Sequence, residues 1–143
     1  MKFGVFYEHQ LPRPWVEGSE QQLFQDALSQ VELADRLGID YAWEVEHHFL
    51  EEYSHSSAPE VFLAAASQRT RRIRLGHGIV LMPPGYNHPA RVAERIATLD
   101  LVSNGRADFG TGNPPPAPSS RASASIRASA APCGGRRWSR SPT

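Results

Sequence analysis

Residues 73–81 read IRLGHGIVL, a short apolar run with two glycines. Its length and branched side chains favour a buried strand. A helix is predicted before it, from the SAPE stretch at residues 57–60, and apolar residues at helical spacing follow it from Pro89 to Gly105. A strand between two helical segments indicates a parallel sheet with helical crossovers.

The same alternation extends in both directions along the chain. Ser19 is the predicted N-cap of another helix, with Gln22 completing a capping box and Gly38 ending it. The remaining strands are predicted over residues 2–7, 39–45 and 106–112. The order β-α-β-α-β-α-β predicts an α/β fold, either the N-terminal half of a (β/α)8 TIM barrel or a small doubly wound sheet. The second is the weaker prediction, because no G-x-G-x-x-G turn follows the first strand.

The overall composition excludes several classes of function. The 143 residues carry zero formal net charge, so the net charge does not favour binding to nucleic acid or to an anionic membrane. One cysteine, Cys133, permits no disulfide within the chain, and no apolar stretch approaches the length of a membrane span. We therefore expect a cytoplasmic protein.

The stretch EHHF at residues 46–49 is the candidate reaction centre. It follows the predicted strand 39–45, and ligands in α/β proteins gather where strands end. Histidine can donate or accept protons near neutral pH. Neighbouring strand residues point to opposite faces, so we expect only one of His47 and His48 to enter the site and the other to pack under the helices. A hydrogen-bonded structural histidine is the alternative at this point.

A metal site is a competing interpretation of the same region. Histidine and carboxylate side chains are dense between residues 44 and 55, and His48-x-x-Glu51 has helical metal spacing. Neither H-E-x-x-H nor H-x-x-E-H is present, so we predict no metal. Tyr41 and Trp43 are expected to be core aromatics, and His88 is expected to begin a helix.

Four features, in order, resemble the N-terminal half of the bacterial luciferase-like, flavin-dependent monooxygenases. They are MKFG at residues 1–4, EHHF at 46–49, LGHGIVL at 75–81 leading to His88-Pro89, and Leu99-Asp100-x-x-Ser103-x-Gly105-Arg106-x-x-Phe109-Gly110. Family members are (β/α)8 barrels about twice as long, so the resemblance covers about half of that fold, over residues 1–112.

The resemblance implies a chemistry and a set of site residues. Reduced FMN and O2 would oxygenate a small organic substrate, with a separate flavin reductase as a partner and a dimer as the assembly. His47 matches the family's histidine near the flavin. Gly78 and Ile79 match the place where backbone packs against the flavin ring, often through a non-prolyl cis peptide, and Thr111 and Gly112 would face the same site. Two alternatives stay open: a deazaflavin-dependent oxidoreductase of the same superfamily, and a non-catalytic half-barrel subunit.

Residues 113–143 differ in character from the rest. They contain five arginines and no acidic residue, whereas residues 1–112 contain all 15 acidic residues. This Pro, Ala, Ser, Arg and Gly composition predicts a disordered tail. This composition also fits GC-rich DNA that is translated out of frame. A reading frame shifted by two nucleotides can encode acidic residues and apolar residues at helical spacing in this region. We hypothesise a frameshift near residue 113, which an independently confirmed gene frame ending at Thr143 would contradict.

Four strands leave two open sheet edges and half of a barrel core. The chain as written is therefore expected to bind flavin weakly or not at all. A purified, yellow sample of the 143-residue protein with stoichiometric flavin would contradict this expectation.

Overall fold

The structure, a computed structural model, describes residues 1–82 and 86–112. The predicted tail and the hypothesised frameshift lie outside the described residues. The elements follow the predicted order and are β1 (Gly4–Tyr7), α1 (Ser19–Leu37), β2 (Tyr41–Glu44), α2 (Pro59–Arg69), β3 (Arg74–Leu81), α3 (Pro89–Val102) and β4 (Ala107–Gly112). No described helix has the length and apolar character needed to cross a membrane.

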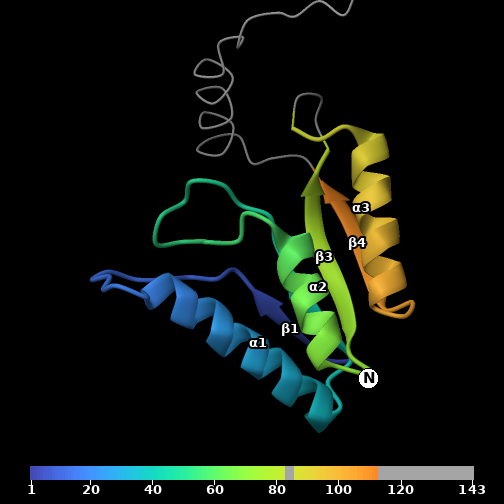
Figure 1. The fold of residues 1–143 in the computed structure, drawn as a ribbon, viewed down its shortest axis with the longest axis horizontal. Helices are drawn as coiled ribbons and strands as arrows, with labels where there is room; N and C mark the ends of the chain where they lie inside the picture. The colour runs from blue at the N-terminus through green and yellow to red at the C-terminus, as the bar shows by residue number, and fades with distance from the viewer. Residues whose placement is uncertain (83–85, 113–143) are drawn as a thin grey trace, which may run out of the picture.

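The four strands form one sheet in the order β1-β2-β3-β4, and each neighbouring pair is parallel. Figure 1 shows β3 and β4 side by side, with the connecting helix α3 beside them. The register runs Tyr7–Glu44–His77–Phe109 across the sheet. Parallel strands joined by helices bring all strand ends to the same edge, and this confirms the half-barrel prediction.

Alternation along the strands divides the sheet into two faces. The face toward the helices joins one apolar core with α1, α2 and Leu99 of α3. The strand residues in or against this core are Val5, Tyr7, Ala42, Leu75 and Ala107. The opposite face, called the open face below, carries the residues between them. Among these, Phe6 is 60% exposed.

Two of the helix starts differ from the sequence prediction. Gly18, with φ 84°, is the N-cap of α1 and Ala58 that of α2, and neither helix has a side-chain cap. Ser19 instead accepts from the backbone N–H of Val16. The capping box is therefore wrong, because the serine lies one position inside the helix. Gly38 does end α1, in the left-handed conformation expected there.

His88 caps α3 as predicted, through Nδ1 accepting from Ala90 N. The arginine-rich run at residues 69–74 ends α2 and begins β3.

Asp35 holds the start of β3 against the end of α1. Its carboxylate accepts backbone N–H bonds from Arg71, Arg72 and Ile73 at 3.0, 2.8 and 2.6 Å. Burial acts to raise the pKa of Asp35, but these bonds and the Arg72 charge outweigh it, so the pKa is lowered. Arg106 makes a similar link by donating to carbonyls of Ser67 and Ile73.

Replacing Asp35 by Asn should lower the free energy of unfolding at pH 7 by about 2 kcal/mol or more, because an amide cannot accept all three N–H bonds. The folded-state pKa is depressed, so the carboxylate stabilises above pH about 4 and this is lost as pH falls through the lower folded value. Urea unfolding at pH 7 and pH 3 measures both effects. Glu32→Gln, on the exposed side of α1, is the control and should change little. Equal losses for the two variants would contradict the assignment.

Candidate functional site

The candidate site lies at the edge where the parallel strands end. Glu8 and His9 follow β1, residues 45–48 follow β2, Met82 follows β3, and Gly112 ends β4. Crossovers carry the chain back between strands, so these segments meet although they are far apart in sequence. The structure therefore places the predicted EHHF stretch at the edge where the strand argument expected it.

His47 forms an ion pair with Glu8 across this edge. The distance from His47 Nε2 to Glu8 Oε2 is 3.4 Å, and the two side chains are 20% and 22% exposed. The His47 ring also packs edge-on against Tyr53, and its backbone N–H donates to the Ser56 carbonyl at 2.7 Å. A partly exposed imidazole beside a carboxylate can hold or transfer a proton. Glu8 was not predicted from the sequence as the partner of His47.

The expected division of His47 and His48 between two faces was argued on a wrong basis. β2 ends at Glu44, so strand alternation does not govern these residues. Both histidines lie in the loop after the strand and both are partly exposed, with His48 at 25%. Each has a different carboxylate, because His48 Nε2 lies 3.0 Å from Glu46 Oε1.

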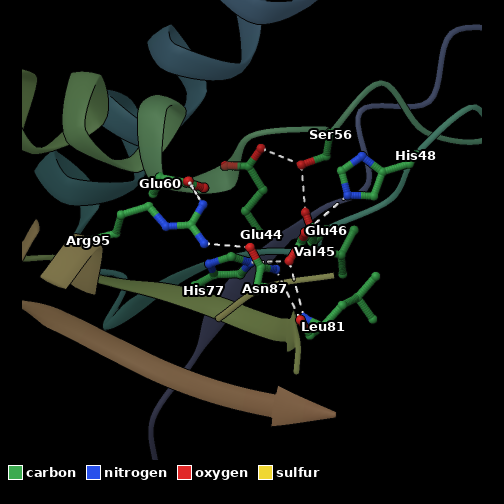
Figure 2. A network of polar contacts seen from close by, with 10 residues as sticks. All are labelled: Glu44, Val45, Glu46, His48, Ser56, Glu60, His77, Leu81, Asn87 and Arg95. Atoms are coloured by element: carbon green, nitrogen blue, oxygen red, sulfur yellow. Dashed lines mark hydrogen bonds and ion pairs between the residues drawn. The ribbon is translucent and has the colours of Figure 1, made fainter. Parts of the chain in front are cut away.

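Glu46 connects this loop to the end of β3, as Figure 2 shows. Its Oε2 accepts the Leu81 backbone N–H at 3.2 Å and lies 3.7 Å from His77 Nε2. The Leu81 carbonyl accepts from Asn87, which in turn accepts from Arg95. One carboxylate thus fixes the loop that carries His47 to the end of the adjacent strand.

Burial and neighbouring charge act differently on Glu46 and His77. Burial acts to raise the pKa of Glu46, but the contacts with His48, Leu81 N and His77 outweigh burial, so the pKa of Glu46 lies below its usual value. Burial lowers the pKa of His77 despite the nearby Glu46. His77 is 3% exposed on the helix-facing side, beside a cavity of about 10 Å³ lined also by Glu60 and Arg95. It belongs to the interior under the edge, a placement that the sequence left open.

Gly78 and Ile79 lie at an irregularity of β3, where the register with β4 shifts between His77 and Val80. This is the bulge that strand glycines commonly mark. Ile79 is 47% exposed. The Gly78–Ile79 bond is not among the cis peptides of the described residues, where the Arg13–Pro14 bond is cis. The non-prolyl cis peptide that the resemblance implied is therefore absent here.

Thr111 and Gly112 end β4 in register with Val80 and Leu81. A Cβ on Gly112 would lie 2.6 Å from Ile79 Cγ2, so Ile79 lies directly over Gly112. A Cβ on Gly110 would lie 2.2 Å from the Gly78 carbonyl oxygen. Thr111, which lies between these two glycines in β4, is exposed. The structure brings Gly78, Ile79 and Gly112 together, whereas His47 contacts Glu8 after β1 and Tyr53 and Ser56 in the segment after β2.

Tyr41 and Trp43 are not members of the apolar core, contrary to expectation. They lie on the open face, with stacked rings 6.0 Å apart, and Trp43 covers Gly76. Tyr41 and Trp43 are excluded from the core because they alternate along the strand with Ala42 and Glu44, which face the helices. Within residues 1–82 and 86–112, no group of three or more His, Cys, Asp or Glu side chains is arranged to hold a metal ion.

The amino-acid sequence matches a known protein family over most of its length. Residues 1–129 match the family described as luciferase-like monooxygenase. The chain belongs to this family. A luciferase-like assignment agrees with the resemblance read from residues 1–112, and the match extends past Gly112.

Curated relatives of this luciferase-like chain include enzymes of two cofactor types. It is 45% identical to limonene 1,2-monooxygenase of Rhodococcus erythropolis, over 77% of this chain and 27% of that protein. It is 33% identical to the oxygenase component of a flavin-dependent trigonelline monooxygenase of Acinetobacter baylyi, over 77% and 29%. It is also 35% identical to an F420-dependent glucose-6-phosphate dehydrogenase of Amycolatopsis mediterranei, over 56% and 24%.

Among solved structures, monooxygenase RslO1 from Streptomyces bottropensis is similar with a TM-score of 0.68 and 42% identity, covering 78% of this chain and 33% of that one. The luciferase-like chain thus matches about a third or less of the relatives' length. This is shorter than the half that was expected from the resemblance.

Replacing Glu46 by Gln should reduce the free energy of unfolding at pH 7 by about 1–2 kcal/mol, through loss of the charged acceptor for Leu81 N and His48. The pKa of Glu46 is lowered in the folded state, so its contribution is present above pH about 4.3 and disappears as pH falls through the folded value. Thermal unfolding across pH 3–8 measures this. Glu94→Gln, on the exposed surface of α3, is the matched control. A deficit that persists unchanged at pH 3 would contradict the explanation.

Proposed function

We propose that the protein is a flavin-dependent monooxygenase of the luciferase-like type, which uses reduced FMN and O2 to oxygenate a small organic substrate. Two relatives, limonene 1,2-monooxygenase and the flavin-dependent trigonelline monooxygenase, support this reaction class. An oxygenase component among the relatives supports a separate flavin reductase as partner. The main observation from this chain is the packing of Ile79 on Gly112 at the edge that also holds the Glu8–His47 pair.

The residues at this edge fit a flavin ring. The ring is flat and largely apolar, and the open face offers the exposed side chains of Phe6 and Ile79. Gly78, Gly110 and Gly112 have no side chains, so nothing projects from the sheet beside Ile79 at these positions. When bound, the reduced flavin supplies the electrons for O2 activation. Phe6, Gly78, Ile79 and Gly112 would hold one side of it and limit its access to water.

We expect His47 to donate or accept a proton in this reaction. Glu8 Oε2 lies 3.4 Å from His47 Nε2, close enough for the carboxylate to take part when the imidazole passes a proton to or from the bound groups. Tyr53 restricts the ring from one side, and the bond from His47 N to Ser56 fixes its backbone. His47 is therefore the proposed catalytic residue, and Thr111 with Gly112 the proposed limit of the cofactor site on β4.

Amide and histidine-ring NMR signals of the 143-residue protein, titrated with FMN to about 1 mM, test the site. Shifts should concentrate at residues 78, 79, 111 and 112 and at the His47 ring, but not at the ring of His55, which pairs with Glu20. Ile79→Glu should weaken FMN binding about tenfold or more by placing a charge against the ring. Val61→Glu, at an exposed position on α2, is the matched control.

Shifts confined to the arginine cluster at residues 69–72 would contradict the proposed site, whereas an absence of shifts would agree with the expectation that the chain as written does not bind flavin. The same titration with a deazaflavin decides the cofactor, which an F420-dependent relative leaves open between two types. Tighter binding of the deazaflavin at the same residues would move the proposal to hydride transfer.

A further inference from the structure

The end of β1 holds a buried polar pair that the proposed flavin chemistry does not use. His9 Nε2 lies 3.0 Å from Glu44 Oε1, and each side chain is 1% exposed. The His9 ring packs against Phe24 and Phe62, with centroid distances of 4.6 and 4.8 Å. An apolar side chain would fill such a site without the cost of burying two ionisable groups. Burial raises the pKa of Glu44 even though His9 and Ser56 act against it. Packing alone therefore does not account for the pair.

The backbone at His9 separates its side chain from that of Glu8. His9 has φ 52°, a left-handed conformation that is uncommon for a residue with a side chain. From this turn, His9 reaches Glu44 in the interior, while Glu8 reaches His47 at the edge. The His9 carbonyl also accepts the His55 N–H at 3.0 Å. The buried ring and this carbonyl bond both hold the turn that lies next to Glu8.

Ser56 links the same pair to the backbone of His47. Its Oγ lies 2.7 Å from Glu44 Oε1 and 2.6 Å from the Val45 carbonyl, so its single proton can go to either oxygen (Figure 2). Its carbonyl accepts the His47 N–H at 2.7 Å. The contacts run from His9 through Glu44 and Ser56 to His47. Glu8, the chain neighbour of His9, contacts His47 from the other side.

We propose that His9 and Glu44 are positioning residues for the Glu8–His47 pair, holding it from beneath the edge through Ser56 and through the turn at His9. The proposal rests on the proposed role of His47, but its geometric part is measurable without flavin. A buried pair used in this way restricts the loop to one arrangement, a role for which buried polar groups are retained in some proteins.

Amide hydrogen exchange of the 143-residue protein tests the proposal. In Glu44→Ala, the His47 amide should exchange about tenfold faster or more, because the hold on Ser56 is lost. The Leu75 amide, which donates to the Arg106 carbonyl at the opposite end of the sheet, should change less than about twofold. Glu44→Gln should restore slow exchange at His47, because its amide oxygen still accepts from Ser56.

Ser56→Ala provides a second variant, which decides the matter if Glu44→Ala does not fold. It removes only the hydroxyl and should speed exchange at His47 about fivefold with Leu75 unchanged. Equal acceleration at both amides, or none at His47, would show that the pair serves the core alone and would overturn the proposal. This result is independent of the FMN titration, so failure of the flavin site and failure of the positioning role are distinguishable.

Discussion

Parallel pairing of four strands is the constraint on which the rest of the structure depends. Each strand must be followed by a crossover before the chain can pair again, so α1, α2 and α3 cover one face and every strand ends at the same edge. That edge carries Glu8 and the loop after β2 in one group of contacts, and the glycines of β3 and β4 in another. At the opposite end, Asp35 and Arg106 satisfy the backbone groups where β3 begins. This topology therefore places stabilising contacts where the strands begin and the candidate site where they end.

The sequence predicted the elements well because their signals are local. Apolar spacing, Gly38 after α1 and Pro89 at the start of α3 act within a few residues, and the structure confirms each of them. The failures involve choices between neighbouring positions. Ser19 and Ser57 are good capping residues, but the turns before the helices place Gly18 and Ala58 at the N-caps instead. Local propensity predicts that a helix begins, whereas tertiary contacts decide at which residue.

The sequence predicted where the candidate residues lie in the fold but not which residues they contact. The family pattern led to His47, Gly78, Ile79, Thr111 and Gly112, and all of them lie at or beside the strand ends. The partners Glu8, Glu46 and Ser56 were missed because each contact joins segments that only the folded sheet brings together. A signal for Glu8 existed in its position directly after the first predicted strand. Strand alternation misled at His47 and His48, since it was applied beyond the end of β2.

The central claim is that the strand-end edge is a flavin site with His47 beside the ring. A crystal structure of the protein with FMN tests it most directly. The account predicts electron density for the ring against Ile79 and Gly112 on the open face, with His47 still paired to Glu8 and facing the ring. Density for FMN on the helical face or in the arginine cluster at residues 69–72, with the edge empty, would contradict the account.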